Sequence, residues 1–320
     1  MITLAISCGD PAGIGYEIIA KSILHYHPAD VRYKIFGVKS VFDSLSERFG
    51  WAKKFIREIE SRNFIDLISV SDEKNLPVGK IDVRCGEVAY RSIIAAIESV
   101  KIGDSDAIIT APISKKAIHL AGYDFAGHTE ILAKEFDRPV TMMLFARNFR
   151  VSLATTHIPI KDVASSISVD SILGHLHRTH SALMNWFGIS NPKIGVLGLN
   201  PHAGENGDIG DEETIISQAI EIASKESIEA EGPLVPDVAF IPSRRRKYDA
   251  YLAMFHDQGL IPLKTLGFRN GVNITLGLPK VRTSPDHGTA FDIAGKGIAN
   301  PRSFRQAIAS AFKILLRSGK

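Results

Sequence analysis

Cysteine is scarce in this 320-residue chain, where only Cys8 and Cys85 occur. So few thiols argue against a disulfide framework and a thiolate zinc site, and they favour a reducing compartment. The first seven residues contain no basic leader, and no apolar run reaches the roughly 18 residues that cross a bilayer. We therefore expect a soluble cytoplasmic protein that has no membrane partner.

A strong excess of charge of one sign is also missing. The 38 basic and 35 acidic side chains leave a net charge of only +3, whereas proteins that track phosphate backbones carry concentrated basic patches. A basic run at Arg244–Lys247 is predicted to be solvated surface, in a loop without aromatic partners. Nucleic acid is therefore not expected as a partner.

The two common glycine-rich phosphate motifs are absent as well. Residues 9–15, of sequence GDPAGIG, follow an apolar segment and precede a helical pattern, yet they match neither the dinucleotide fingerprint G-x-G-x-x-G nor the P-loop. Their glycines allow a tight turn, and helix amides at this place attract anions. A structural turn and a ligand site both stay open, and Asp10 inside the turn favours the ligand site.

What the sequence does contain is a regular alternation of short apolar runs and helical patterns. Helices are expected near 14–25, 87–101, 128–136, 170–187, 211–226 and 302–317. Strands are expected at Ile2–Ser7, Tyr33–Phe36, Asp106–Thr110, Val140–Phe145, Arg150–Thr155, Lys193–Leu197, Asp249–Met254 and Asn273–Leu276. The alternation predicts a layered α/β fold with a largely parallel sheet. At about 150 residues per domain, the length suggests two lobes.

Three histidines stand where an expected strand passes into a loop, namely His157, His202 and His256. The corresponding edge of an α/β sheet is where ligand sites gather. Imidazole is a common ligand of divalent metals, and three ligands leave positions open for a substrate. Their spacing is no local motif, so ordinary polar loop residues are the alternative. By contrast, His175, His177 and His180 share one expected helix and are predicted to form a solvated face.

Donors suited to a phosphate form a second group. His128 and Thr129 open an expected helix, where imidazole, hydroxyl and free amides suit an anion; alternatively, Thr129 only caps the helix. Lys264, Asn273 and Arg282 are expected in loops or at strand ends. Arginine can hold a phosphate through two parallel bonds, and lysine adds a point charge. Solvation at the surface is the alternative for each of these three.

Six ordered blocks together resemble the 4-hydroxythreonine-4-phosphate dehydrogenases of pyridoxine biosynthesis. They lie at residues 9–15, 127–130, 154–157, 198–205, 255–259 and 271–279. The resemblance implies an isopropylmalate-dehydrogenase-like three-layer α/β/α fold with two lobes and a cleft between them. The implied cofactor lobe is 1–120 plus 265–320, and the implied substrate, metal and dimerisation lobe is 121–264. It also implies a homodimer in which both subunits contribute to each active site.

The same resemblance assigns roles to the residues noted above. His157, His202 and His256 would bind a divalent cation such as Zn, Mg or Co, and His128, Thr129, Lys264, Asn273 and Arg282 would hold the phosphorylated substrate. The implied reaction is the NAD(P)-dependent oxidation of 4-phosphooxy-L-threonine to 2-amino-3-oxo-4-phosphooxybutanoate. That product decarboxylates to 3-amino-2-oxopropyl phosphate. Asp257 and Lys264 are the candidates for proton transfer, Asp257 alternatively being a loop-capping carboxylate.

A second resemblance lies at residues 286–301, which are similar to the adenosine-binding loop of isopropylmalate and isocitrate dehydrogenases. By this likeness the cofactor is NAD or NADP, held by Asp286, His287, Gly288, Thr289, Ala290 and Asp292. In those enzymes an aspartate at the position of Asp292 holds the ribose hydroxyls. Because a carboxylate repels a 2′-phosphate, we expect NAD to be preferred over NADP.

The chain departs from the family pattern at Tyr16, where proline is usual, and at 236–238, where Pro-Asp-Val replaces Ala-Asp-Thr. The exact substrate is therefore open, and D-threonate or D-erythronate 4-phosphate is the alternative within the same chemistry. A metal-dependent hydrolase and a non-catalytic phosphate sensor are alternatives of other classes. The adenosine-type loop argues against the hydrolase, and the metal histidines argue against the sensor.

Overall fold

The computed structural model describes residues 1–61, 63–267 and 271–319 of the chain. It consists of two compact units. Unit 1 comprises Met1–Arg138 and Leu278–Lys320, and unit 2 comprises Pro139–Gly277. The functional division predicted above has other limits, at 120/121 and 264/265, and stays a prediction.

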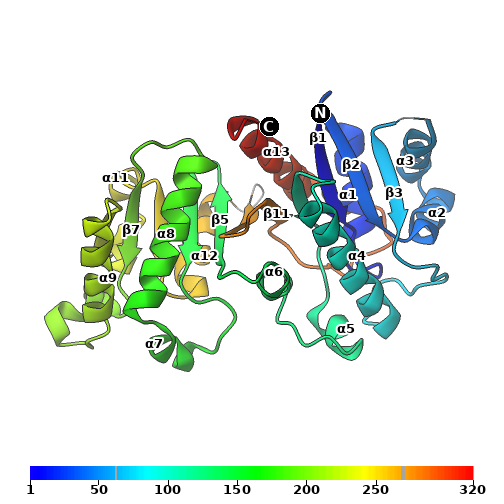
Figure 1. The fold of residues 1–320 in the computed structure, drawn as a ribbon. Coiled ribbons are helices and arrows are strands. Elements are labelled where there is room, and N and C mark those ends of the chain that lie inside the picture. The colour runs from blue at the N-terminus through cyan, green and yellow to red at the C-terminus, as the bar shows by residue number, and fades with distance from the viewer. Residues whose placement is uncertain (62, 268–270, 320) are drawn as a thin grey trace. The chain divides into compact units, whose positions relative to one another are not determined.

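Unit 1 is built on five parallel strands in the order β3-β2-β1-β4-β11 (Figure 1). The strands are β1 (Ile2–Ser7), β2 (Val31–Gly37), β3 (Ile65–Ser69), β4 (Ala107–Thr110) and β11 (Val281–Pro285). The helices are α1 (Gly15–His25), α2 (Lys39–Arg48), α3 (Gly50–Ser61), α4 (Val83–Lys101), α5 (Lys115–Leu120), α6 (His128–Phe136) and α13 (Arg302–Arg317).

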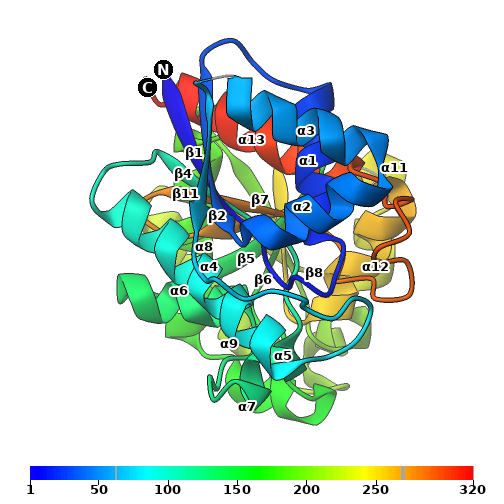
Figure 2. The same ribbon diagram turned by 90° about the vertical axis from the view of Figure 1, so that its right-hand side faces the viewer.

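Helices cover both faces of the unit 1 sheet, as Figure 2 shows. Helix α4 starts at Asp82, whose carboxylate accepts the Arg84 N–H at 2.9 Å. Its stripe of Ile93, Ile97 and Val100 is buried against β1, β2 and β4, and each such side chain contributes about 1.5–3 kcal/mol. Helix α13 packs against β4 and β11, and α1 lies beside it on the opposite face from α4.

Unit 2 has six strands in the order β10-β5-β6-β9-β7-β8. The strands are β5 (Thr141–Ala146), β6 (Phe149–Leu153), β7 (Lys193–Leu197), β8 (Glu229–Leu234), β9 (Ala250–Ala253) and β10 (Val272–Leu276). Strand β5 is antiparallel to both of its neighbours, whereas β6, β9, β7 and β8 run parallel. The longer helices are α8 (Val169–Asn185), α9 (Glu213–Lys225) and α12 (His256–Gly267).

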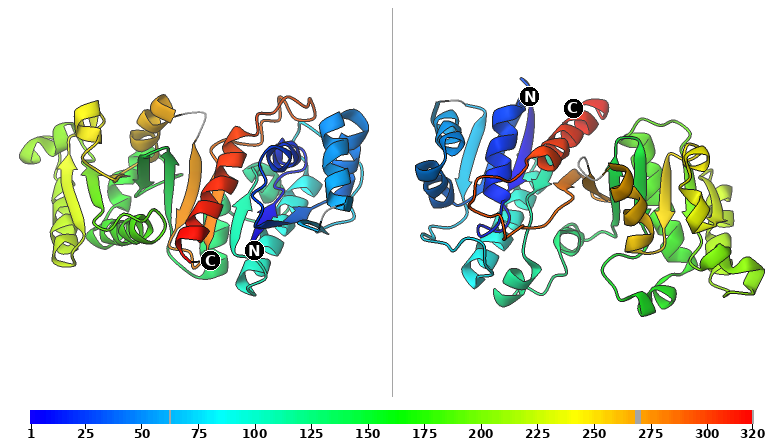
Figure 3. Two further views of the ribbon diagram at one scale, coloured as in Figure 1. Left: turned by 90° about the horizontal axis from the view of Figure 1, so that it is seen from above. Right: turned by 180° about the vertical axis from the view of Figure 1, so that it is seen from behind.

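Helix α12 packs on β5, β6 and β9, and α8 covers the other face of this sheet (Figure 3). Short helical turns complete the unit: η1 (Ile160–Asp162), α7 (Val163–Ser166), η2 (Pro201–Gly207), α10 (Pro236–Ala239) and α11 (Pro242–Arg245). The core on the α12 side includes Val151, Leu153, Tyr251 and Leu263. Each unit therefore has the helix–sheet–helix layering of an α/β protein.

The predicted layered α/β class is confirmed, and all eight expected strands are present within one or two residues at most ends. The structure adds β3, β8 and β11, which were not predicted. Strand β8 has the sequence EAEGPL and β11 the sequence VRTSP, so neither shows an apolar run. In the part of the chain that is described, no helix is long and apolar enough to span a membrane.

Candidate active site

The three histidines predicted to bind metal follow the carboxyl ends of neighbouring parallel strands. Strand β9 pairs with β6 on one side and with β7 on the other. His157 follows β6, His256 follows β9 and His202 follows β7. Parallel strands end at the same edge of a sheet, so the three connecting segments start side by side.

Hydrogen bonds between main chain and side chain tie these three strand ends together. Thr155 donates to the Met254 carbonyl through its amide at 3.1 Å and through its hydroxyl at 2.7 Å. Gln258 accepts the Met254 N–H at 2.7 Å and donates to the Gly198 carbonyl at 2.7 Å. Buried bonds of this kind hold the start of each loop in place.

Two of the histidines lie close together. The ring centroids of His157 and His256 are 5.9 Å apart. The Nδ1 atom of His256 is 2.6 Å from a carboxylate oxygen of Asp257. A carboxylate on one ring nitrogen fixes the tautomer and leaves the other nitrogen, Nε2, for a metal ion. His256 was predicted to lie in a loop, but it is the first residue of α12.

His202 lies on an exposed turn. Residues 202, 203, 205 and 206 all have positive φ angles within η2. Asn200 anchors the turn, because its side chain donates to Glu212 at 2.7 Å and its amide donates to Glu213 at 2.7 Å. Within the described ranges, no three His, Cys, Asp or Glu side chains lie close enough to hold one metal ion. The metal triad therefore stays a prediction.

A cavity of about 620 Å³ opens beside His202 in unit 2. Apolar side chains line much of it, among them Leu199 and Phe255. Pro236, which replaces the alanine of the family pattern, also lines the cavity, as does the unchanged Asp237 beside it. If the substrate binds at His202, the residues that line this cavity would affect which substrate is accepted.

Arg282, one of the predicted phosphate donors, lies in unit 1. This side chain is only 1% exposed and donates to the Thr110 hydroxyl at 2.5 Å. Burial lowers the pKa of Arg282 to about 9, so the guanidinium is still protonated at neutral pH. A buried guanidinium needs an opposite charge or strong acceptors. Arg282 was predicted in a loop or at a strand end, and it is the second residue of β11, all five residues of which are buried.

His128 belongs to the same site as Arg282. Burial first, and then the Arg282 charge, lower the pKa of His128 well below its usual value. Its Nε2 atom is buried and has no hydrogen-bond partner in the described part of the chain. Thr129 is not the helix cap, since α6 is preceded by Gly127 with no side-chain cap. A neutral imidazole and a guanidinium are thus available to an anion at the start of α6.

The remaining predicted donors lie in unit 2. Asn273 is the second residue of β10, and Lys264 lies on α12, half-buried, rather than in a loop. The Oδ1 atom of Asn273 is buried without a hydrogen-bond partner among the described residues. The structure therefore groups His128, Thr129 and Arg282 in one unit and places Lys264 and Asn273 in the other.

The segment 286–301, predicted to bind the cofactor and called the cofactor loop below, contacts the glycine-rich turn at 9–15. The Ile14 amide donates to the Thr289 carbonyl at 3.0 Å, and a side chain at Gly13 would come within 2.9 Å of that same oxygen. Gly9 has a φ of +68°, and a Cβ there would lie 2.2 Å from the Pro112 carbonyl. The turn therefore has a structural role at Gly9 and presses against the cofactor loop at Gly13.

Helix α1 holds the far end of the cofactor loop through a buried ion pair. Glu17 is 2% exposed, accepts from Lys21 at 2.6 Å and accepts the Ala299 N–H at 2.8 Å. Lys21 also donates to the carbonyls of Gly297 at 2.8 Å and Ala299 at 3.1 Å. Sequence reasoning missed both residues, although an acidic residue followed four positions later by a lysine on a helix is a recognisable pair.

A cavity of about 320 Å³ lies between these same segments in unit 1. It is lined by Pro11 and Gly13 of the turn, by Arg48 and Lys74, and by Gly295 of the cofactor loop. Asp292 is exposed on the loop, and burial lowers the pKa of His287. The carboxylates of Glu17, Asp43 and Glu47 line the cavity as well, so its formal charge of 2 − 3 = −1 does not by itself favour phosphate groups.

Comparisons with known proteins identify the family of the chain. A family model described as "Pyridoxal phosphate biosynthetic protein PdxA" matches residues 31–311. The chain is 43% identical to a 4-hydroxythreonine-4-phosphate dehydrogenase of Sulfurihydrogenibium, with 99% of each chain covered. It is 40% identical to a D-threonate 4-phosphate dehydrogenase of Salmonella typhimurium, with 98% of each covered. The crystal structure of a 4-hydroxythreonine-4-phosphate dehydrogenase from Klebsiella pneumoniae superposes with a TM-score of 0.82 at 36% identity, covering 98% of this chain and 99% of that one.

Proposed function

This chain belongs to the PdxA family of pyridoxal phosphate biosynthetic proteins, and we propose that it is the dehydrogenase that oxidises 4-phosphooxy-L-threonine. One observation carries the proposal: Arg282 and His128 form a cationic site inside unit 1 that has its charge buried. Burial of a guanidinium is costly unless negative charge lies near it. Glu130 supplies part of that charge, and a bound phosphate would supply more. The phosphate of a phosphorylated substrate is the group that fits it best.

The metal-binding role of His157, His202 and His256 belongs to this proposal. The donor chemistry fits, since two of the imidazoles lie 5.9 Å apart and Asp257 fixes the tautomer of His256. When bound, a divalent cation supplies positive charge that stabilises an alkoxide at the substrate's secondary hydroxyl. His202 would complete the set, by movement of its turn or from a second subunit.

The nicotinamide cofactor is assigned to unit 1. Gly295 of the cofactor loop and Pro11 and Gly13 of the turn line one cavity there, together with both basic and acidic side chains. The Ile14 amide also joins the turn to the loop at Thr289. Exposed Asp292 would accept hydrogen bonds from the ribose hydroxyls. A carboxylate at that place repels a 2′-phosphate, so NAD is the cofactor proposed.

In the reaction, the substrate carbon that bears the hydroxyl gives a hydride to the nicotinamide ring and its hydroxyl proton to a base. The protein's task is to align the two carbons, with the phosphate held at Arg282 and His128. Lys264 and Asp257 are the proposed proton carriers. The ketone formed lies β to the carboxylate, which leaves as carbon dioxide while its electron pair moves toward the carbonyl.

The direct test measures reduced nicotinamide by absorbance, with purified protein, NAD and a panel of four-carbon phosphates. The proposal expects turnover with 4-phosphooxy-L-threonine, and loss of that turnover after treatment with a chelator and recovery with Zn²⁺, Mg²⁺ or Co²⁺. An absence of turnover with every member of the panel would overturn it.

A second candidate substrate is D-threonate 4-phosphate, because the Salmonella relative is named as a dehydrogenase of that compound. The observation that favours it is the departure at 236–238, because Pro236, one of the two replaced residues, lines the cavity beside His202. Tyr16, the other departure, is a core residue whose hydroxyl accepts the Val38 N–H at 3.0 Å. A kcat/KM for D-threonate 4-phosphate above that for 4-phosphooxy-L-threonine would assign the chain to this second activity.

The substitution Arg282→Lys tests the phosphate site itself. Lysine keeps the charge but cannot form two parallel bonds, so the KM for the phosphorylated substrate should rise at least ~10-fold. The KM for NAD should stay within about twofold, because the cofactor loop is untouched. An equal rise in both constants would show a general structural defect instead of a phosphate contact.

A further inference from the structure

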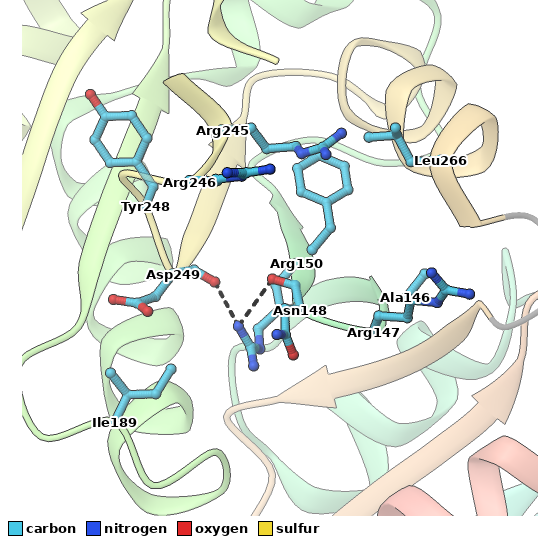
Figure 4. A pocket seen from close by; sticks show the side chains of 11 residues that line it. Ala146, Arg147, Asn148, Arg150, Ile189, Arg245, Arg246, Tyr248, Asp249 and Leu266 are labelled. Atoms are coloured by element: carbon cyan, nitrogen blue, oxygen red, sulfur yellow. Dashed lines mark hydrogen bonds between the residues drawn. The ribbon is translucent and has the colours of Figure 1, made fainter. Parts of the chain in front are cut away.

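Unit 2 contains another cavity, of about 680 Å³, which Figure 4 shows. Several of its lining residues lie at the strand ends opposite to those that the three histidines follow. Its lining includes Arg150 near the start of β6, Asp249 just before β9 and Ile189 shortly before β7. These three strands are parallel, and His157, His256 and His202 follow their other ends. The cavity is therefore separate from the histidine site by the length of the strands.

Positive charge dominates this cavity, which we name the arginine cavity. Arg147, Arg150, Arg245 and Arg246 line it together with the single carboxylate of Asp249, a formal sum of 4 − 1 = +3. Figure 4 shows Arg245 and Arg246 on one side of it and Arg150 on the other. Asp249 is already engaged, since it accepts the Lys193 N–H at 2.9 Å. Across the described ranges, no salt bridge involves Arg147, Arg245 or Arg246.

Two of these guanidinium groups are held in place by aromatic rings. Arg150 lies 4.6 Å over the ring of Phe187, and it donates to the carbonyls of Asn148 at 3.4 Å and Asp249 at 3.0 Å. Arg245 lies 5.8 Å from the ring of Phe149. The sequence-based expectation that 244–247 forms a loop without aromatic partners is therefore wrong. Arginines already fixed by packing lose less entropy when they bind an anion.

We propose that the arginine cavity binds a small organic polyphosphate, a pyrophosphate group joined to a flat ring. The volume lies within the range of about 300–1,000 Å³ that is usual for small-molecule sites. A surplus of three positive charges matches a pyrophosphate better than the single phosphate of the proposed substrate. Phe149, Ile189 and Leu266 give the cavity an apolar wall on which a ring can lie. A nucleoside polyphosphate and a dinucleotide both have this chemistry.

The basic run offers a matched pair of double variants for the test. R245A/R246A removes two charges from the cavity, and R244A/K247A removes two charges from the same run at residues that do not line it. Titration calorimetry of the full chain would use ADP, NAD and inorganic pyrophosphate as separate probes. The expected result is ADP binding that weakens at least ~10-fold in R245A/R246A and less than ~2-fold in R244A/K247A.

The substitution R147A, at the turn between β5 and β6, gives an independent reading from another element. It should weaken ADP binding in the same direction, and it decides the matter if R245A/R246A fails to fold. Weaker binding of pyrophosphate than of ADP would show that the ring contributes. If the parent binds a second equivalent of NAD and R147A does not, the ligand is a dinucleotide. If R147A loses only ADP binding, the ligand is a nucleoside polyphosphate. Equal weakening by both double variants, or ADP binding unchanged in R147A, would overturn the proposal.

Discussion

At the scale of single residues, Asp257 has one contact that explains what it can do. Its carboxylate lies 2.6 Å from Nδ1 of His256, so it acts through the imidazole. The substitution Asp257→Asn should weaken Zn²⁺ binding about 10- to 100-fold, as loss of such outer partners commonly does. Calorimetry of the protein with Zn²⁺ alone measures this without relying on turnover.

The matched control is Asp170→Asn, which removes an exposed carboxylate in the first turn of α8. It should leave Zn²⁺ affinity within about twofold, because a screened surface charge acts weakly at a distance. If both variants lose affinity equally, the effect comes from net charge, and Asp257 does not position His256.

The residues themselves show what sequence reasoning can reach. Arg282 and His128 were singled out by chemical type, and the structure indeed brings them together. Their burial could not be predicted, because an arginine within VRTSP gives no sign that both faces of that strand are covered. His175 shows the opposite error: it was expected on a solvated face, yet it contacts Thr141 at 2.7 Å, and burial lowers its pKa to about 4.

At the scale of elements, helix α1 and the cofactor loop act together through Glu17. The substitution Glu17→Ala leaves Lys21 without its buried partner and leaves the Ala299 amide without an acceptor. Breaking a buried pair on one side costs about 3–5 kcal/mol. We expect that loss in urea unfolding, together with a several-fold rise in the KM for NAD.

Glu17→Gln is the companion variant, because glutamine keeps an oxygen that can accept the Ala299 N–H. It should cost less than Glu17→Ala in unfolding free energy and should raise the KM for NAD less. A loss of stability without any change in that KM would restrict the ion pair to a structural role.

Some helices and strands can be predicted from the sequence and others cannot. Strand β1 and helix α4 were predicted because a continuous apolar run and a helical apolar stripe leave little choice. Strand β8 was missed because an edge strand with one solvated face tolerates Glu, Gly and Pro. Helix α12 was missed because Pro262 lies inside it and its first turn, His-Asp-Gln-Gly, resembles a loop.

At the scale of the whole molecule, Asp10 sets a pH dependence of stability. It is fully buried, and burial raises its pKa from 3.8 to about 6. The folded state therefore binds the extra proton between about pH 4 and 6, and the free energy of unfolding falls as pH rises through that window. A shift of about two pKa units corresponds to roughly 3 kcal/mol lost by pH 7.

Asp10→Asn removes this titration and keeps an oxygen for the Ala12 N–H, which Asp10 accepts at 2.9 Å. The variant should therefore gain stability over the parent as pH rises from 4 to 7, in urea unfolding at several pH values. Burial lowers the pKa values of His128 and His175, so their contribution to the free energy of unfolding changes with pH in the opposite direction and falls as pH falls. Both histidines are present in the parent and in the variant, so the comparison cancels their contribution. Asp30→Asn, at an exposed position, should show no such pH-dependent difference.

The predicted homodimer with shared active sites can be tested by complementation. A site formed by two subunits can be restored by combining two chains that are each inactive. His157→Ala and Arg282→Ala should each abolish turnover, since one removes a proposed metal ligand and the other the phosphate contact. If His157 and Arg282 of different subunits serve one site, each hybrid dimer has one site with both lesions and one with neither. With half of the dimers hybrid after unfolding and refolding together, activity should return to about a quarter of the parent value. Mixtures that stay inactive, although hybrids form, would show that His157 and Arg282 of the same chain serve one site.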